Sequence, residues 1–224
     1  MKERSILFNT PMVQAILAGR KTQTRRLIKP QPAWIGDPNV AFKTDSANSK
    51  GIISCPYGQV KDRLWIKETW GCSVTTGERK GVWYQASMED NDKWNRCLEY
   101  NFADWDLIKN KWFQLWEKYQ DKKRPSIFMP KWASRITLEI TDLKVERIQD
   151  ISAEDTIAEG LKYCPNATGG GGWVMPGSKY DLAGLCYSMP ETAFHCGIDE
   201  IYPGILKANP YVWAISLKVQ EVKR

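Results

Sequence analysis

The stretch "ILAGRKTQTRR", residues 16–26, combines groups suited to acid–base chemistry with groups suited to anion binding. A threonine hydroxyl such as that of Thr24 becomes a nucleophile when a base lies beside it. Neighbouring cations lower the pKa of a lysine, so Lys21 is a candidate for that base. The same cations could instead contact RNA or DNA phosphates, or form a solvated basic loop, and the spacing alone leaves these alternatives open. The cations of the stretch are Arg20, Lys21, Arg25 and Arg26.

A second group of candidate residues lies in "WIKETW", residues 65–70. Lys67 and Glu68 stand between Trp65 and Trp70. An indole can stack on a nucleobase while charged groups read the edge of the base, which predicts the wall of a pocket. The alternative interpretation is a strand with one solvated face and a local ion pair.

A third candidate is Glu159, in "DISAEDTIAEGL". This stretch predicts a helix with Ser152 as the N-cap, Asp155 at the third position, close to a capping box, and Gly160 at the end. Glu159 then lies at the negative end of the helix, where a carboxylate is unfavourable. That position favours a functional role, although an exposed helix-end glutamate is the alternative.

These residues have to be positioned by strands and short helices. Residues 4–8 predict a strand, and Thr10–Pro11 predicts the start of a helix, capped by the threonine, that ends at Gly19. Because side chains alternate along a strand, Lys21 and Thr24 converge only if the chain turns between them.

The remaining patterns predict more strands than helices. Strands are expected at 62–70, at 132–148 as one bent strand or two, and at 211–222, with a helix near 104–119. Residues 29–42 are expected to form a loop, 71–130 to be Trp-rich and otherwise irregular, and 166–184 to be flexible. We therefore expect an α+β fold, a small mixed or antiparallel β-barrel with two helices against it.

Composition narrows the classes of function. The chain has 224 residues and a net charge of +6, which is a mild preference for anionic partners. Its eleven tryptophans suit a large core, a stacking surface or both. Its single histidine, His195, and the lack of a GxSxG motif argue against Ser–His–Asp catalysis. The six cysteines form no CxxC, so we expect free thiols, no metal and no cofactor. No apolar run approaches the about 20 residues of a membrane span and no secretory signal is evident, which predicts a cytoplasmic protein without a membrane partner.

Four stretches together resemble the ASCH family of small proteins with a PUA-like β-barrel, in a form like that of phage or prophage members. The resemblance covers residues 1–28, 60–70, 132–161 and 200–219 of a single domain, and leaves 30–60, 71–130 and 163–198 as insertions. The stretches are "ILAGRKTQTRR", "RLWIKETW", "RITLEITDLKVERIQDISAEDTIAEG" and "NPYVWAISLK".

The resemblance implies a function and a set of site residues. Short bacterial ASCH proteins are amidohydrolases that convert N4-acetylcytidine to cytidine and acetate. Their catalytic Lys, Thr and Glu fall on Lys21, Thr24 and Glu159 of this sequence. Other members of the family are linked to RNA binding or RNA cleavage, so the expected partner is a modified nucleoside or RNA. The expected substrate-binding residues are Arg20, Arg25, Arg26, Trp65, Lys67, Glu68, Trp70 and Lys131.

Overall fold

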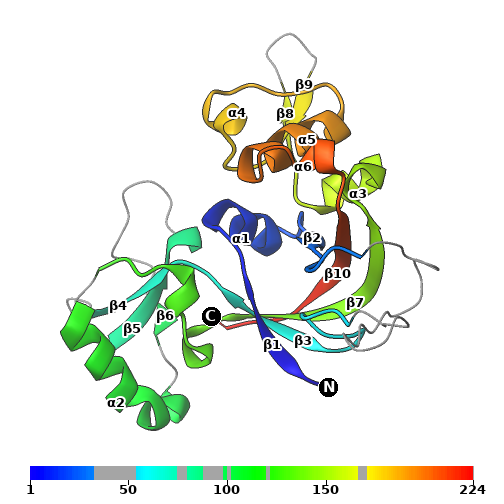
Figure 1. Cartoon of the computed structure of the whole chain (residues 1–224). Coiled ribbons are helices and arrows are strands. Elements are labelled where there is room, and N and C mark those ends of the chain that lie inside the picture. Colours follow the sequence, from blue (N-terminus) through cyan, green and yellow to red (C-terminus); the bar gives the residue numbers. More distant parts are fainter. Residues whose placement is uncertain are drawn as a thin grey trace. The chain divides into compact units, whose positions relative to one another are not determined.

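The computed structural model describes residues 1–32, 54–74, 80–87, 98–99, 102–119, 122–165 and 171–223 (Figure 1). The chain divides into two compact units, each assembled from three stretches of sequence. Unit 1 consists of Met1–Lys2, Ala15–Arg63 and Glu139–Lys218, and unit 2 of Glu3–Gln14, Leu64–Leu138 and Val219–Arg224. The predicted insertion at 30–60 lies mostly outside the described residues.

A five-stranded sheet joins strands from both ends of the sequence. Its strand order is β1-β3-β7-β10-β2. The strands are β1 (Glu3–Leu7), β2 (Gln23–Leu27), β3 (Arg63–Lys67), β7 (Ile136–Arg147) and β10 (Tyr211–Val222). β2 runs antiparallel to β10, with Thr24 opposite Ile215 and Arg25 opposite Ala214. In the described residues β1 and β2 are the edges of the sheet, so closure into a barrel is not confirmed. The described residues contain both sheets and helices, which makes the fold α+β.

The helix before the basic stretch lies where the sequence predicts it. Helix α1 spans Thr10–Leu17, and Gly19 follows it with a positive φ of 72°. The cap is Asn9 rather than Thr10, because the Asn9 side-chain oxygen accepts a hydrogen bond from the Met12 amide at 3.0 Å. Asn9 is as good a cap as threonine, so the helix begins one residue earlier than predicted.

Helix α3 (Ala153–Ala158) confirms the helix predicted for residues 150–161. The Ser152 hydroxyl accepts a hydrogen bond from the Asp155 amide at 3.2 Å, as expected for an N-cap. Gly160 ends the helix with a φ of 97°, a conformation that favours glycine.

Several stretches that the sequence left irregular are ordered. The Trp-rich stretch carries β4 (Trp70–Val74), β5 (Lys80–Tyr84) and β6 (Leu98–Glu99). Helix α2 (Phe102–Tyr119) confirms the helix predicted near residues 104–119. Residues 162–208 carry β8 (Lys162–Pro165), β9 (Gly171–Val174), α4 (Lys179–Leu182), α5 (Pro190–Ile201) and α6 (Ile205–Ala208), all in unit 1 (yellow to orange in Figure 1). Short 3-10 turns occur at Gln85–Ser87, Ser126–Phe128, Lys131–Ala133 and Ile148–Asp150.

These findings correct two predictions. The described residues contain six α-helices rather than two, and residues 171–182 are a strand and a helix rather than a flexible loop. Packing against residues distant in the sequence orders such segments, and a short stretch of sequence does not reveal that packing. Of the two alternatives for residues 132–148, the structure has the single strand β7. No helix in the described ranges has both the length and the apolar character of a membrane span.

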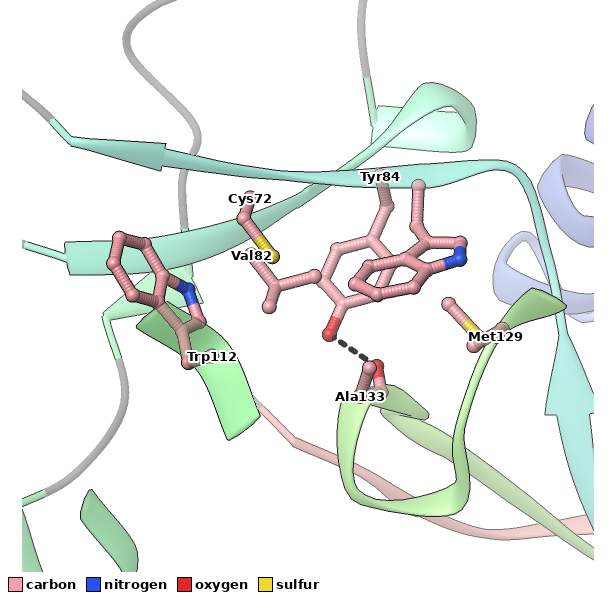
Figure 2. Close-up of a cluster of buried hydrophobic side chains, with 7 residues drawn as sticks. Cys72, Val82, Tyr84, Trp112, Met129 and Ala133 are labelled. Carbon is pink, nitrogen blue, oxygen red and sulfur yellow. Dashed lines mark hydrogen bonds between the residues drawn. The ribbon is translucent and has the colours of Figure 1, made fainter. Parts of the chain in front are cut away.

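The Trp-rich stretch forms a core of its own in unit 2. Figure 2 shows Tyr84 and Trp112 among the buried side chains of this cluster. The Tyr84 hydroxyl donates to the Ala133 carbonyl oxygen at 2.7 Å, and the Trp112 indole N–H donates to the Gly81 carbonyl oxygen at 3.1 Å. The cluster comprises Trp70, Cys72, Val82, Tyr84, Trp112, Met129 and Ala133. These tryptophans therefore supply packing, with their polar atoms partly satisfied by the backbone.

Ser152→Ala should destabilise the chain by about 1 kcal/mol, because the first turn of α3 loses its side-chain acceptor. Urea unfolding measures this difference. Ser152→Asp is the matched control, since aspartate caps a helix equally well and should keep wild-type stability. Equal midpoints for Ser152→Ala and the wild type would show that the cap contributes nothing.

Candidate active site

The segment that carries Lys21 is held between the ends of two helices. The Lys21 amide donates to the Ala15 carbonyl oxygen of α1 at 3.1 Å, and the Thr22 amide donates to the Ala158 carbonyl oxygen of α3 at 2.8 Å. Lys21 also forms an isolated β-bridge with Glu159. Lys21 therefore precedes β2 and is not bound by the alternation of that strand.

Lys21 and Glu159 form a buried ion pair within unit 1. The Lys21 Nζ donates to Glu159 Oε2 at 2.5 Å and to the Glu159 carbonyl oxygen at 2.8 Å. The two side chains are only 3% and 8% exposed. Burial lowers the pKa of Lys21, while the charge and hydrogen bond of Glu159 raise it and the charges of Arg26 and Arg25 lower it further. The net direction is downward, as expected for a desolvated amine.

Arg25 binds three carboxylates around this pair. Its Nε donates to Glu146 Oε1 at 2.6 Å, its Nη2 to Asp155 Oδ2 at 3.0 Å and its Nη1 to Glu159 Oε1 at 3.3 Å. The Arg25 side chain is 2% exposed. Gln23 adds a hydrogen bond to Asp155 at 2.9 Å. Removing one partner from such a buried charge network costs about 3–5 kcal/mol.

Thr24 lies between Gln23 and Arg25 in β2 and is 4% exposed. Alternation along the strand places its side chain on the face opposite to those of Gln23 and Arg25. Within the described residues no hydrogen bond joins the Thr24 hydroxyl to Lys21 or Glu159. The structure thus brings Lys21 and Glu159 into direct contact and places Thr24 three residues along the chain from Lys21.

Glycine at position 160 lets the end of α3 approach Lys21. A Cβ built on Gly160 would lie 2.9 Å from Lys21 Cβ and 3.1 Å from Ala15 Cβ. Both distances are shorter than ordinary carbon–carbon contacts. The close approach and the positive φ of Gly160 together explain why glycine follows the candidate glutamate.

The two remaining arginines of the basic stretch lie nearer to solvent. Arg20 is exposed, and its Nη1 donates to the Gly160 carbonyl oxygen at 3.3 Å. Arg26 is half-buried, with its guanidinium 5.9 Å from the centre of the Tyr57 ring. Both arginines belong to unit 1, with Lys21 and Glu159.

The candidates of "WIKETW" belong to unit 2. Glu68 is 1% exposed and accepts two hydrogen bonds from Arg135, each at 2.9 Å. Burial raises the pKa of Glu68, and the hydrogen bond and charge of Arg135 oppose that rise. The Lys67 Nζ lies 5.3 Å from the centre of the Trp65 ring and donates to the Ile127 carbonyl oxygen at 3.1 Å.

Two further candidates also have partners within unit 2. Trp70 is fully buried in the aromatic core, where its ring meets Trp132 edge-on at 5.9 Å. Lys131 is exposed and forms an ion pair with Glu3. Each residue has a described contact that accounts for its position without a ligand.

Sequence reasoning assigns no role in the site to three charged residues that the structure connects to the candidates. Glu146 and Asp155 bind Arg25, and Arg135 binds Glu68. In the sequence, Asp155 stands out only at the start of the predicted helix, and Glu146 is one polar residue in an alternating strand. A charged residue on the face of β2 that turns toward α3 was the one available signal, since such a charge needs a partner.

No protein-family profile, no curated protein and no solved structure matches this chain. The function of the site is therefore inferred from its own geometry and chemistry.

Gly160→Ala should destabilise the chain more than Gly19→Ala. Both glycines have positive φ, which costs an L-residue about 1–2 kcal/mol. Only position 160 adds crowding, because the space around a Cβ at Gly19 is empty within 4 Å. Overpacking of this kind costs about 1–3 kcal/mol more. Urea unfolding of both variants measures the difference, and equal losses would contradict the close packing of Gly160 on Lys21.

Proposed function

We propose that this chain is a PUA-like ASCH protein that hydrolyses N4-acetylcytidine or a related N-acylated nucleoside. The observation that carries the proposal is the buried contact of 2.5 Å between Lys21 and Glu159. A buried lysine with a lowered pKa and a carboxylate partner is a typical general base. Thr24, in the same basic stretch, supplies a hydroxyl that the described hydrogen bonds leave uncommitted.

The proposed reaction uses Thr24 as the nucleophile. Its oxygen attacks the amide carbonyl carbon, and neutral Lys21 accepts the hydroxyl proton. As the C–N bond breaks, Lys21 returns this proton to the leaving amine, which yields cytidine and an acyl ester on Thr24. Water then hydrolyses the ester, releases acetate and restores the threonine. Glu159 orients the Lys21 amine throughout.

The surrounding charges are suited to a lysine that must lose its proton. Burial and the two arginines favour the neutral amine, whereas Glu159 favours the ammonium. Arg25 acts as a positioning residue in this proposal, because three carboxylates already bind its guanidinium. Arg25 links Glu159 to Glu146 of β7 and to Asp155 of α3.

The same contacts weigh against a module that only binds nucleic acid, and against an RNase on the same fold. Such a module needs cations that reach phosphate. Arg25 is buried among carboxylates, and Lys131 is paired with Glu3. A phosphate would have to displace these partners before it contacted Arg25 or Lys131, which leaves Arg20 and Arg26 as the cations of the basic stretch nearer to solvent. We therefore favour hydrolysis, and RNA binding or cleavage becomes an alternative outcome of the test.

Thr24→Ala should abolish hydrolysis of N4-acetylcytidine, measured as release of cytidine and acetate. Lys21→Met should lower kcat/KM by about 10²–10⁴-fold, the usual contribution of a general base. Thr22→Ala is the matched control: Thr22 is exposed and its described hydrogen bonds use only the backbone, so its activity should match the wild type.

Two results would contradict the proposal. The first is a loss smaller than about tenfold for both Thr24→Ala and Lys21→Met, with unfolding curves like that of the wild type. The second is a folded wild type that hydrolyses no acylated nucleoside but binds RNA with an affinity that falls steeply as salt rises. Turnover of an uncharged nucleoside should show no such salt dependence.

The acid limb of the pH profile of kcat/KM should follow the pKa of Lys21, because only the neutral amine accepts a proton. Glu159 raises this pKa, so Glu159→Gln should move the midpoint of the limb to lower pH. Arg26 lowers it, so Arg26→Gln should move the midpoint to higher pH. Relative profiles of the three proteins measure both shifts, even where absolute rates fall. Shifts in the same direction, or none, would assign the base to another residue.

A further inference from the structure

Two cysteines outside the candidate active site meet over the β8–β9 hairpin of unit 1. In the antiparallel pair, Cys164 lies directly opposite Gly172. Residues opposite each other in this way share a face of the sheet, with Cβ positions about 4.5–5.5 Å apart. A Cβ built on Gly172 would lie only 2.8 Å from Cys186 Cβ. The Cys186 Cβ therefore lies over Gly172, on the same face of the hairpin as the Cys164 side chain.

Main-chain contacts hold Cys186 in place over the β8–β9 hairpin. Trp173 and Tyr187 exchange two backbone hydrogen bonds, of 2.6 Å and 2.9 Å, in an isolated bridge. Cys186 is the residue before Tyr187, and so its position on the hairpin is set by main-chain contacts. Gly172 leaves the room, since any larger residue would meet Cys186 and the Tyr187 carbonyl oxygen.

Cys164 also affects the proton affinity of Cys186. Desolvation, followed by the hydrogen bond and the charge of the Cys164 thiol, raises the pKa of the Cys186 thiol. Cys186 is exposed and Cys164 is half-buried, so a small reagent can reach the pair. Cys55 and Cys72 are buried, and Cys196 is half-buried. Cys97 lies outside the described residues.

We propose that Cys164 and Cys186 form an accessible dithiol that exchanges with low-molecular-weight disulfides and closes into an intramolecular disulfide. The Cys186 thiolate attacks one sulfur of a small disulfide, such as oxidised glutathione, and releases one small thiol. The Cys164 thiolate then attacks the sulfur of Cys186 in the mixed disulfide and releases the second small thiol. The protein loses two electrons and two protons, and the small disulfide is reduced to two thiols.

Closing the bond requires little movement. A disulfide needs Cβ atoms about 3.5–4.5 Å apart, and both residues already project over the same glycine. The bond would tie the segment between α4 and α5 to β8. Strand β8 begins at Lys162, two residues after Gly160. The inference does not depend on the proposed hydrolase activity.

The test equilibrates the full chain with mixtures of reduced and oxidised glutathione, blocks the remaining thiols and maps tryptic peptides by mass spectrometry. Trypsin cuts after Lys179, so the bond joins two separate peptides, the second of which contains both Cys186 and Cys196. We expect the Cys164–Cys186 link in the wild type. We expect the same link in Cys196→Ser, the matched control that removes the ambiguity of the second peptide.

Variants of the pair report each step of the exchange. Cys164→Ser should stop at a mixed disulfide that holds one glutathione on Cys186, because the resolving thiol is absent. Gly172→Ala should lower the yield of the link by displacing Cys186 from the hairpin. The proposal is overturned if the wild type holds only mixed disulfides or none in oxidising mixtures. It is equally overturned if the link disappears in Cys196→Ser, which would assign the bond to Cys196.

Discussion

The buried contact between Lys21 and Glu159 constrains much of unit 1. A carboxylate at the C-terminal end of a helix opposes the helix dipole, and burial adds a desolvation cost. Cations from outside α3 must offset both, and Lys21 and Arg25 do so from the segment that leads into β2 and from β2 itself. This contact therefore requires the end of α1, the end of α3 and the start of β2 to lie close together. Gly160 allows this close approach because it has no Cβ.

This contact also balances two opposing effects on one amine. An ion pair that was purely structural would favour a fully charged lysine, yet burial outweighs Glu159 and lowers the pKa of Lys21. Arg25 differs in that three carboxylates match its guanidinium. Two cations four residues apart thus have different environments: three carboxylates bind the guanidinium of Arg25, whereas burial lowers the pKa of the Lys21 amine.

The sequence predicted what local signals control. The cap at Ser152, the ends at Gly19 and Gly160, and the strands β1, β3 and β10 depend on a few neighbouring residues, and the structure confirms them. The contact of Lys21 with Glu159 was expected only through the family resemblance, because no local pattern joins residues so far apart.

The missed features are those that depend on distant partners. Glu146 and Asp155 form ion pairs with Arg25, and these pairs exist only when β2, β7 and α3 are assembled. The Trp-rich stretch looked irregular because its tryptophans pack on residues from other segments, such as Met129 and Ala133. Closure of the sheet into a barrel likewise depends on long-range pairing that alternation along a single strand does not specify.

The interleaving of the two units has a consequence for how such a chain can vary. The backbone passes from one unit to the other five times, after Lys2, Gln14, Arg63, Leu138 and Lys218. A single cut in the gene therefore never separates one whole unit from the other, and recombination with another gene at one point would leave both cores incomplete. Proteins with this architecture therefore cannot exchange a whole unit by a single recombination event. Their sequences have to diverge by point substitution and by insertion or deletion of segments inside a unit.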